Sequence, residues 1–215
     1  MSLDNRFTRV KKQRVMKLLR PDSSQCVLDI GCAVGTMMVM LASHVRKIMG
    51  FDFIGLTVSY ARKQFRAINP DKPFCGFCAD TQMLPLKNNA FDGATAVDFT
   101  EHIDDTVFEL MLSETYRVLK PGAALVIYTP NPTHLFEWMM KHNIILKENT
   151  AHIALRPMRQ YITMLRDHGF AIREAYFEPT HIPLIRLIER MVMPVPLIGA
   201  LARRRICIRA VKPAA

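Results

Sequence analysis

The chain has 215 residues, of which 50% are hydrophobic and 22% are charged. This balance excludes intrinsic disorder, and a chain of this length buries enough surface to fold as one domain without disulfides or a structural metal. The 29 Lys and Arg residues outnumber the 19 Asp and Glu residues, so the net charge is +10. A positive field of this size favours anionic partners such as nucleic acid, anionic lipid or a phosphorylated small molecule.

The five cysteines follow no regular spacing, and their odd number indicates reduced thiols. No apolar segment before a cleavage site occurs near the N-terminus, so no secretory signal is predicted and we expect a cytoplasmic protein. The longest apolar stretch, residues 182–202, contains Arg186, Glu189, Arg190 and three prolines. These residues exclude a membrane-spanning helix.

The predicted elements begin with an amphipathic, basic helix over residues 4–19. After it the hydrophobic period changes, and short apolar runs alternate with helical patterns. The predicted strands cover 26–30, 47–53, 73–79, 91–99, 122–129, 170–177 and 206–211. The remaining predicted helices cover 37–45, 58–67, 106–119 and 156–168. This alternation predicts crossover connections and a mostly parallel sheet with helices on both faces.

The predicted organisation is one domain over residues 1–215. Its parts are an N-terminal helical cap (4–24), a core (25–130), an insertion (131–155) and a C-terminal helix and strand region with an apolar, basic tail (156–215). Ligands of parallel sheets bind at the carboxyl ends of the strands. We therefore expect the ligand at that edge of the core, and substrate specificity in the insertion.

A glycine turn follows the first predicted strand, where Asp29 is followed by Gly31 and Gly35. Glycine after a buried strand permits a sharp turn and lets a ligand approach backbone N–H groups, and the next helix presents its positive end. A dinucleotide site would require the tighter spacing Gly-x-Gly-x-x-Gly. An acid at this position suits a ligand with an ammonium group and repels phosphate.

The segment 27–36 resembles motif I of the class I S-adenosylmethionine-dependent methyltransferases, with Ala33 in place of the family's common middle glycine. Segments 50–53, 78–85, 91–102 and 117–122 resemble later motifs of the family in the same order, so the resemblance spans most of the chain. It implies an α/β fold, namely a three-layer α/β/α Rossmann-like sandwich. Its seven-stranded sheet is expected to be mostly parallel, with the last strand antiparallel.

The same resemblance implies S-adenosylmethionine as the cofactor. The methionine part is expected at the turn after Asp29, the ribose hydroxyls at Asp52 and the adenine amino group at Asp80. Phe53 and Phe99 are either walls for the adenine or methionine part, or core residues. The complete set of expected cofactor-binding residues is Asp29, Gly31, Cys32, Ala33, Gly35, Asp52, Phe53, Asp80, Thr81, Asp98 and Phe99.

Displacement at the methyl carbon of a sulfonium depends mainly on positioning in a dry pocket. A base is needed only if the acceptor must lose a proton, and imidazole suits this task near neutral pH. The candidate catalytic residues are His102, beside the end of the fourth strand, and His152, in the insertion. His134 and His142 are further candidates, and a surface or packing role is the alternative for each histidine.

A metal site is a further hypothesis at the end of the fourth strand. Asp98, Glu101 and His102 resemble a motif of ubiquinone-pathway O-methyltransferases, some of which hold a divalent ion with it. The Glu-His pair also occurs in relatives without metal, so we expect no metal. Cys75 and Cys78 are not ligands in this interpretation, because residues three apart on a strand point to opposite faces.

The expected acceptor is a small molecule, with oxygen favoured over nitrogen or carbon as the accepting atom. The sequence after the fourth strand does not resemble the motif of methyltransferases that act on amines of nucleic acid, and no separate nucleic-acid module is visible. A methyltransferase-like protein that binds or methylates RNA stays an alternative. A nicotinamide dehydrogenase is a third candidate, and the spacing of Gly31 and Gly35 argues against it.

The tail places apolar residues on one side of residues 182–193 and Arg186, Glu189 and Arg190 on the other. A segment of this kind suits a lipid-like acceptor or contact with an anionic membrane. The favoured interpretation is ordinary core packing between the last two strands or a dimer contact, so a homo-oligomer is also a candidate. We expect the positive charge at the two ends of the chain and the acids around the catalytic centre.

Overall fold

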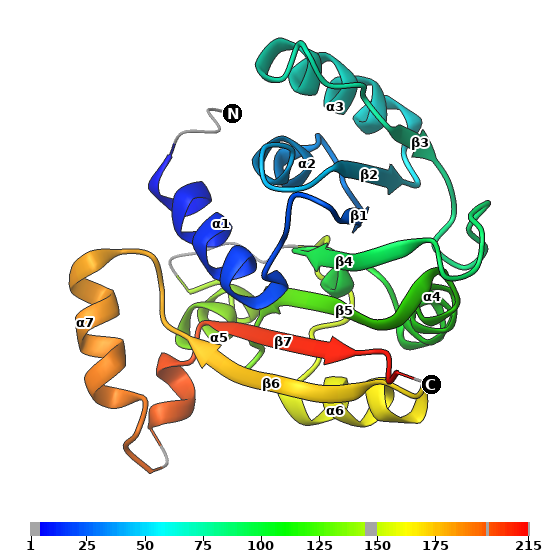
Figure 1. The fold of residues 1–215 in the computed structure, drawn as a ribbon. Coiled ribbons are helices and arrows are strands. Elements are labelled where there is room, and N and C mark those ends of the chain that lie inside the picture. The colour runs from blue at the N-terminus through cyan, green and yellow to red at the C-terminus, as the bar shows by residue number, and fades with distance from the viewer. Residues whose placement is uncertain (1–4, 145–149, 197, 215) are drawn as a thin grey trace.

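The computed structural model describes residues 5–144, 150–196 and 198–214. In this part of the chain, seven strands form one twisted sheet in the order β3-β2-β1-β4-β5-β7-β6 (Figure 1). The strands are β1 (Cys26–Ile30), β2 (Lys47–Asp52), β3 (Gly76–Cys78), β4 (Phe91–Val97), β5 (Leu119–Pro130), β6 (Ala171–Glu178) and β7 (Arg205–Val211). β7 runs antiparallel to both of its neighbours, and the other strands run parallel. The predicted fold class is therefore confirmed.

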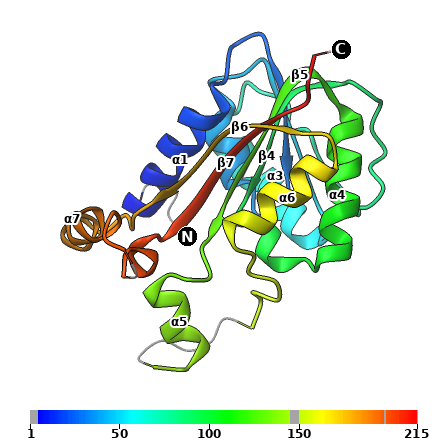
Figure 2. The same ribbon diagram turned by 90° about the horizontal axis from the view of Figure 1, so that it is seen from below.

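Helices cover both faces of the sheet and make three layers (Figure 2). On one face lie α1 (Arg6–Leu19), α2 (Thr36–Leu41) and α3 (Gly55–Ile68), and on the other lie α4 (Asp105–Val118) and α6 (Met158–Asp167). The shorter α5 (Leu135–Lys141) and the C-terminal α7 (Pro183–Val192) project from this body. Two 3-10 turns, Thr100–His102 and Gly199–Ala202, complete the regular elements of the described chain.

Two hydrophobic cores lie on opposite faces of the sheet because side chains alternate along each strand. On β5, Leu125 and Ile127 face the core under α4 and α6, whereas Val126 and Tyr128 face the core under α1, α2 and α3. A parallel sheet that is covered on both faces has strands that are apolar on both sides. This is why the first strand, 26–30, reads as a continuous apolar run with one acid.

The fifth strand begins earlier than predicted. Leu119 already pairs with Phe91 of β4, and the register of the two strands shifts between Phe91 and Gly93. Pro121 and Gly122, which indicate a helix stop and a turn, therefore lie within an irregular strand, and Gly122 has a φ of 83°. The left-handed conformation of Gly122 allows the chain to bend there and still pair with its neighbours.

The expected packing of the tail as ordinary core is wrong. α7 does not lie between the last two strands, which pair directly with each other. Its large apolar side chains Leu184, Leu187 and Met191 are mostly exposed. Helical spacing correctly indicated a two-sided helix, but it carries no information about which side faces the protein.

Candidate functional site

A cavity of about 470 Å³ opens at the carboxyl ends of β1, β2, β3 and β4. Its walls come from the turns that follow these strands and from the start of α4. It is lined by Gly31, Ala33, Phe51, Asp52, Phe53, Ile54, Ala79, Asp80, Thr81, Gln82, Asp98, Phe99, His102, Ile103 and Val107. Strands that run in the same direction end at the same edge of the sheet, so five separate segments of sequence meet here.

The glycine turn after β1 forms one wall of the cavity. Gly31 has a φ of 65°, and a Cβ at this position would lie 2.1 Å from the ring of Phe99. Only glycine therefore lets Phe99 close against the turn. Ala33, at the position where the resembled family commonly has glycine, has a φ of 44°, a left-handed conformation that an L side chain rarely adopts.

Asp52 ends β2 and holds two turns together with its carboxylate. One oxygen accepts a hydrogen bond from the backbone N–H of Ala33 at 2.9 Å, and the other accepts from the N–H of Ile54 at 2.9 Å and the hydroxyl of Thr57 at 3.1 Å. The neighbouring Phe53 is 75% exposed. The acid is thus fixed at the cavity wall with an exposed ring beside it.

Asp80 and Thr81 follow β3 on the opposite wall. Oδ1 of Asp80 accepts a hydrogen bond from the backbone N–H of Gln82 at 2.9 Å, which holds the carboxylate in a tight turn. Thr81 is buried, and its hydroxyl has no hydrogen-bond partner among the residues that the structure describes. A buried hydroxyl without a partner costs stability unless a ligand supplies one.

Asp29 lies behind the glycine turn and is buried. Its Oδ1 accepts a hydrogen bond from the hydroxyl of Thr95 at 2.8 Å, but Oδ2 has no partner in the described part of the chain. Burial raises the pKa of Asp29 to about 7, although the bond from Thr95 opposes this shift. A cation next to Oδ2 would restore the ordinary charge state of this carboxyl.

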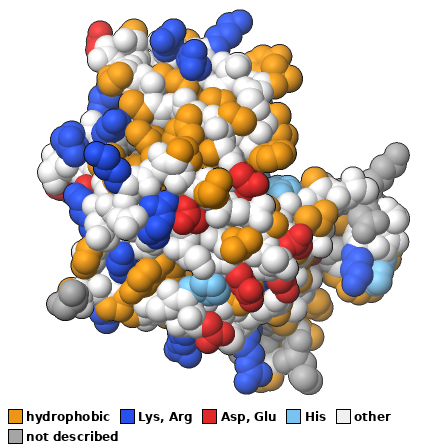
Figure 3. All heavy atoms as spheres, turned by 90° about the vertical axis from the view of Figure 1, so that its right-hand side faces the viewer, with side chains coloured by type: hydrophobic (Ala, Val, Ile, Leu, Met, Phe, Trp, Pro, Cys, Tyr) orange, Lys and Arg blue, Asp and Glu red, His pale blue; other side chains and the backbone are white. Residues whose placement is uncertain are grey.

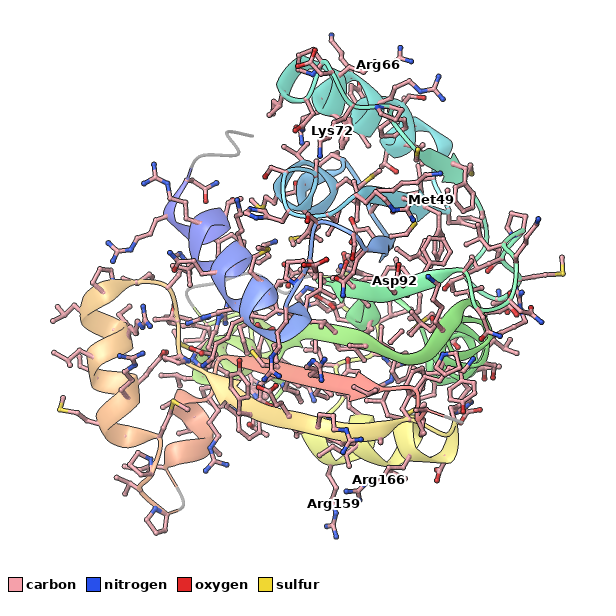
Figure 4. The ribbon with its side chains drawn as sticks, viewed as in Figure 1. Met49, Arg66, Lys72, Asp92, Arg159 and Arg166 are labelled. Atoms are coloured by element: carbon pink, nitrogen blue, oxygen red, sulfur yellow. The ribbon has the colours of Figure 1, made fainter. Side chains whose placement is uncertain are left out.

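Asp98, after β4, lies between two cations. Nζ of Lys11 lies 2.7 Å from Oδ2, and Nη1 of Arg205 lies 2.7 Å from Oδ1. Burial acts to raise the pKa of Asp98, but these two charges hold it below its usual value. The expectation that the positive charge stays away from the centre is therefore wrong for Lys11 and Arg205. Other cations do lie outside, and Arg159 and Arg166 point away from α6 (Figure 4).

Three of the expected cofactor-binding residues, Asp29, Cys32 and Gly35, do not line the cavity. Cys32 is buried, and its backbone N–H donates to the carbonyl oxygen of Phe51 at 2.8 Å. Gly35 has a φ of 80° and packs against Ala61 of α3, where a Cβ would lie 2.9 Å from the alanine side chain. Cys32 and Gly35, like Asp29, therefore support the turn from behind.

The two candidate catalytic histidines lie together. The rings of His102 and His152 have centroids 5.4 Å apart, although fifty positions separate them in the sequence. Nδ1 of His102 lies 2.7 Å from the carbonyl oxygen of Ala151. Because a carbonyl only accepts, this contact places the proton of His102 on Nδ1 and leaves Nε2 free to accept one. The other two histidines lie elsewhere: His134 is buried at the start of α5, and His142 packs against Trp138.

Glu137 was not predicted and lies beside this pair. It is buried in α5, with Oε2 3.7 Å from Nδ1 of His152 and Oε1 3.1 Å from Nη1 of Arg204. Burial lowers the pKa of His152, and the charge of Glu137 opposes that shift. The only sequence signal for Glu137 is an acid within the apolar run 135–140.

Arg156 is a second residue that the sequence analysis missed. It is fully buried and donates to the carbonyl oxygens of Thr100 and Ile103 at 2.6 and 2.7 Å, and to Oδ1 of Asp105 at 2.6 Å. Through these bonds, the end of the insertion is tied to the turn that carries His102. No local pattern around Arg156 indicates this role.

Glu101, His102 and His152 carry side chains that commonly bind metal ions, and they lie together near the cavity. Ligand atoms of Glu101, His102 and His152 all lie within 4.8 Å of one another. The set differs from the one considered from the sequence, because the two oxygens of Asp98 contact cations. Burial raises the pKa of Glu101 to about 8, with a further contribution from Asp98, and the hydroxyl of Thr129 donates to its Oε2 at 2.9 Å.

Comparison with known proteins identifies the family. The model of a family described as "Methyltransferase domain" matches residues 3–175. The chain belongs to this family. It is a class I S-adenosylmethionine-dependent methyltransferase, and its cofactor is S-adenosylmethionine. The resemblance drawn from the five motifs is confirmed.

Relatives of this methyltransferase act on different atoms. It is 32% identical over 131 residues to 24-methylenesterol C-methyltransferase 2 of Arabidopsis thaliana, a match that covers 60% of this chain and 36% of the plant protein. It is 28% identical over 190 residues to an O-methyltransferase of Pyrenophora dematioidea, covering 84% of this chain and 67% of the fungal protein. The chain thus spans little more than a third of the length of the plant relative.

Solved structures share the fold of this methyltransferase at low identity. A methyltransferase from Archaeoglobus fulgidus gives a TM-score of 0.71 at 20% identity, over 97% of this chain and 95% of that one. Geranyl diphosphate C-methyltransferase from Streptomyces coelicolor, solved with Mg²⁺, geranyl diphosphate and S-adenosyl-L-homocysteine, gives 0.69 at 15% identity, over 95% and 80%. These likenesses concern the fold alone.

Proposed function

We propose that this protein transfers a methyl group from S-adenosylmethionine to an oxygen of a small, apolar acceptor. The observation that carries the proposal is the pair of His102 and His152 at the edge of the cofactor cavity. An oxygen acceptor must lose a proton, whereas many other acceptors need no base. Two adjacent imidazoles at this edge supply one.

The residues of the cavity fit the cofactor. Oδ2 of Asp29 and the hydroxyl of Thr81 are buried without partners in the described residues, as expected of groups that a polar ligand completes. The methionine part is assigned to the turn of Gly31 and Ala33, the ribose to Asp52 and the adenine amino group to Asp80. Phe53 is assigned to the adenine face, because its ring is exposed at the wall.

Bound there, the cofactor supplies an electrophilic methyl group on a cationic sulfur, and the residues of this chain orient the acceptor and take up its proton. His102 lines the cavity and presents an unprotonated Nε2 when Nδ1 donates to Ala151. His152 stands behind it, with Glu137 at its Nδ1. When Nε2 of His102 takes the proton from the acceptor oxygen, the ring becomes a positively charged imidazolium, which Glu137 and Asp98 stabilise from nearby.

Several apolar groups near the cavity favour an apolar acceptor. Figure 3 shows hydrophobic side chains gathered on the half of one face where α3 lies. A second cavity of about 350 Å³ lies on the far side of His152, between α5 and the segment that returns to α6. Its apolar lining residues are Pro132, Met140, Ile153 and Leu155, and its polar ones are Glu137, Lys141 and His152. We assign acceptor recognition to the second cavity, beside His152.

We also place the protein in the cytoplasm, because its five thiols are unpaired.

Activity is tested with the intact chain, labelled S-adenosylmethionine and a metabolite extract, followed by identification of the labelled product. With that product in hand, His102→Gln and His152→Gln are each expected to reduce kcat by about 100-fold, the usual contribution of a general base. Affinity for S-adenosylhomocysteine should stay unchanged. His142→Gln is the matched control and should turn over like the wild type.

Four outcomes would contradict the proposal. Product carrying the methyl group on carbon or nitrogen would exclude the oxygen acceptor, and unaltered turnover of both histidine variants would exclude the base. Activity that EDTA removes and Zn²⁺ or Mg²⁺ restores would assign Glu101, His102 and His152 to a metal instead. For the RNA alternative, tight and steeply salt-dependent RNA binding without cofactor affinity would be decisive.

A further inference from the structure

α7 is an amphipathic helix whose apolar side faces solvent and whose polar side faces the protein, the reverse of an ordinary surface helix. Of its residues only Glu189 is buried, with 6% of its surface exposed. Leu184, Leu187 and Met191 are 70%, 58% and 62% exposed. A surface helix of a globular protein normally buries its apolar side and exposes its polar side. The apolar side of α7 therefore faces outward, and the helix projects from the body (Figure 2).

Polar contacts fix this orientation. Oε1 of Glu189 lies 2.9 Å from Nε2 of His134, and the other oxygen accepts from the backbone N–H of Thr180. Nδ1 of His134 accepts from the N–H of Phe136 at 3.1 Å, so the ring proton sits on Nε2 and is donated to Glu189. If α7 rotated to bury its leucines, Glu189 would lose its hydrogen bonds with His134 and with the backbone N–H of Thr180. The helix is thus held with its apolar side away from the protein.

The chain after α7 extends the same apolar surface. Val195, Ile198 and Leu201 are exposed large hydrophobic residues of the turn that leads to β7. Gly199 lets this turn pack closely against the end of α7, because a Cβ there would lie 2.4 Å from the carbonyl oxygen of Met193. Contiguous exposed apolar surface of this kind marks a site of interaction.

The charges around this surface are positive. From residue 179 to the end of the sequence, Glu189 is the single acid, and it is buried. Arg190 is exposed on α7, and Arg6 of α1 lines a groove with Ile182 and Pro183 at the start of the helix. A two-fold contact between copies would bring this cationic surface against itself, whereas anionic headgroups would neutralise it.

We propose that α7 docks on an anionic membrane surface, with Leu184, Leu187 and Met191 inserted among the lipids and Arg6 and Arg190 at the headgroups. This arrangement matches the physical chemistry of helices that lie in the membrane interface. No helix in the described part of the chain is long and apolar enough to cross a bilayer. The proposal goes beyond methyl transfer and does not depend on the identity of the acceptor.

The test is sedimentation of the full chain with vesicles of phosphatidylcholine alone, or with roughly a third phosphatidylglycerol, at low and high salt. We expect binding to the anionic vesicles that weakens with salt, and at least about tenfold less binding to the neutral ones. The triple variant Leu184→Gln, Leu187→Gln, Met191→Gln should lose binding to both by about tenfold or more. Arg6→Gln with Arg190→Gln should lose the preference for anionic lipid.

The matched control carries Ile68→Gln and Leu110→Gln, which remove exposed apolar side chains on α3 and α4. It should bind vesicles like the wild type. Circular dichroism and affinity for S-adenosylhomocysteine show that each variant is folded. Wild-type binding by the triple variant, or no binding by the wild type, would overturn the proposal. A lipid-free dimer that the triple variant dissociates, without vesicle binding, would assign the surface to a second copy of the chain instead.

Discussion

The guanidinium of Arg205 contacts the carboxylate of Asp98 at 2.7 Å, across the edge of the sheet where β4 ends and β7 begins. Arg205 is almost completely buried, and Lys11 from α1 approaches the second oxygen of Asp98. The first helix and the last strand therefore both contribute a cation to the same acid. This arrangement closes the N-terminal and C-terminal parts of the chain over the candidate site.

A double-mutant cycle on this pair measures its contribution to stability. Breaking a partly buried ion pair leaves one charge poorly solvated, so we expect Asp98→Asn and Arg205→Met to interact by about 2 kcal/mol. Urea unfolding of the wild type, both single variants and the double variant gives the interaction energy. Additive effects of the two changes would mean that the contact contributes nothing.

Asp52→Asn should weaken binding of S-adenosylhomocysteine by about 10- to 100-fold, because a charged acceptor of two hydroxyl hydrogen bonds is lost. Isothermal titration calorimetry measures this affinity. Asp71→Asn, on an exposed loop before β3, is the control and should bind like the wild type. An unchanged affinity of the Asp52 variant would remove the ribose assignment.

Ala33→Gly should leave the free energy of unfolding unchanged or raise it by up to about 1 kcal/mol. Glycine relieves the left-handed backbone of Ala33, and this gain offsets the entropy it adds to the unfolded chain. The control, Ala67→Gly on the exposed side of α3, should instead lose about 0.5–1 kcal/mol. Chemical denaturation measures the free energy of unfolding of both variants. An equal loss of stability in the two variants would indicate that the backbone of Ala33 carries no strain.

The buried carboxyl of Glu101 predicts a pH dependence of stability. Burial raises its pKa from the ordinary value of 4.5 to about 8 in the folded protein, so the folded state binds more protons than the unfolded state between these two values. Stability contributed by this group is present below the unfolded pKa and falls as pH rises toward 8, by up to about 1.4 kcal/mol per pH unit. Glu101→Gln should flatten this fall.

The measurement is urea unfolding of the cofactor-free wild type and of the Glu101→Gln variant at pH 5.5, 6.5 and 7.5. Asp29, whose pKa is also raised, contributes a fall with the same sign in both proteins, so the difference between them isolates Glu101. Parallel pH profiles for wild type and variant would show that Glu101 titrates normally.

Glu137→Gln tests whether this acid positions His152 in the proposed reaction. Loss of the negative charge lowers the pKa of His152, so the acid limb of the kcat/KM profile should move to lower pH while kcat falls by about tenfold. Glu109→Gln, on the exposed side of α4, is the control. A change in cofactor affinity or stability without a shift of the pH profile would assign Glu137 a structural role only.

The sequence alone determined the architecture and the order of its elements. Strand β1 was predicted at its observed bounds, because a five-residue apolar run between polar turns has few alternatives. Motifs at Gly31, Asp52 and Asp80 placed the cavity, since strands of a parallel sheet bring their carboxyl ends to one edge. These features depend on residues that are close together in the sequence and on a regular fold.

Tertiary structure decided the features that depend on residues far apart in the sequence. Arg205 reaches Asp98, and Glu137 reaches His152, only because the sheet order places β7 beside β5 and brings the insertion over the end of β4. The outward orientation of α7 likewise depends on the contact of Glu189 with His134, fifty-five positions away. Hydrophobic periodicity shows that a helix is amphipathic. Which of its sides packs against the protein depends on tertiary contacts, here those of the polar side.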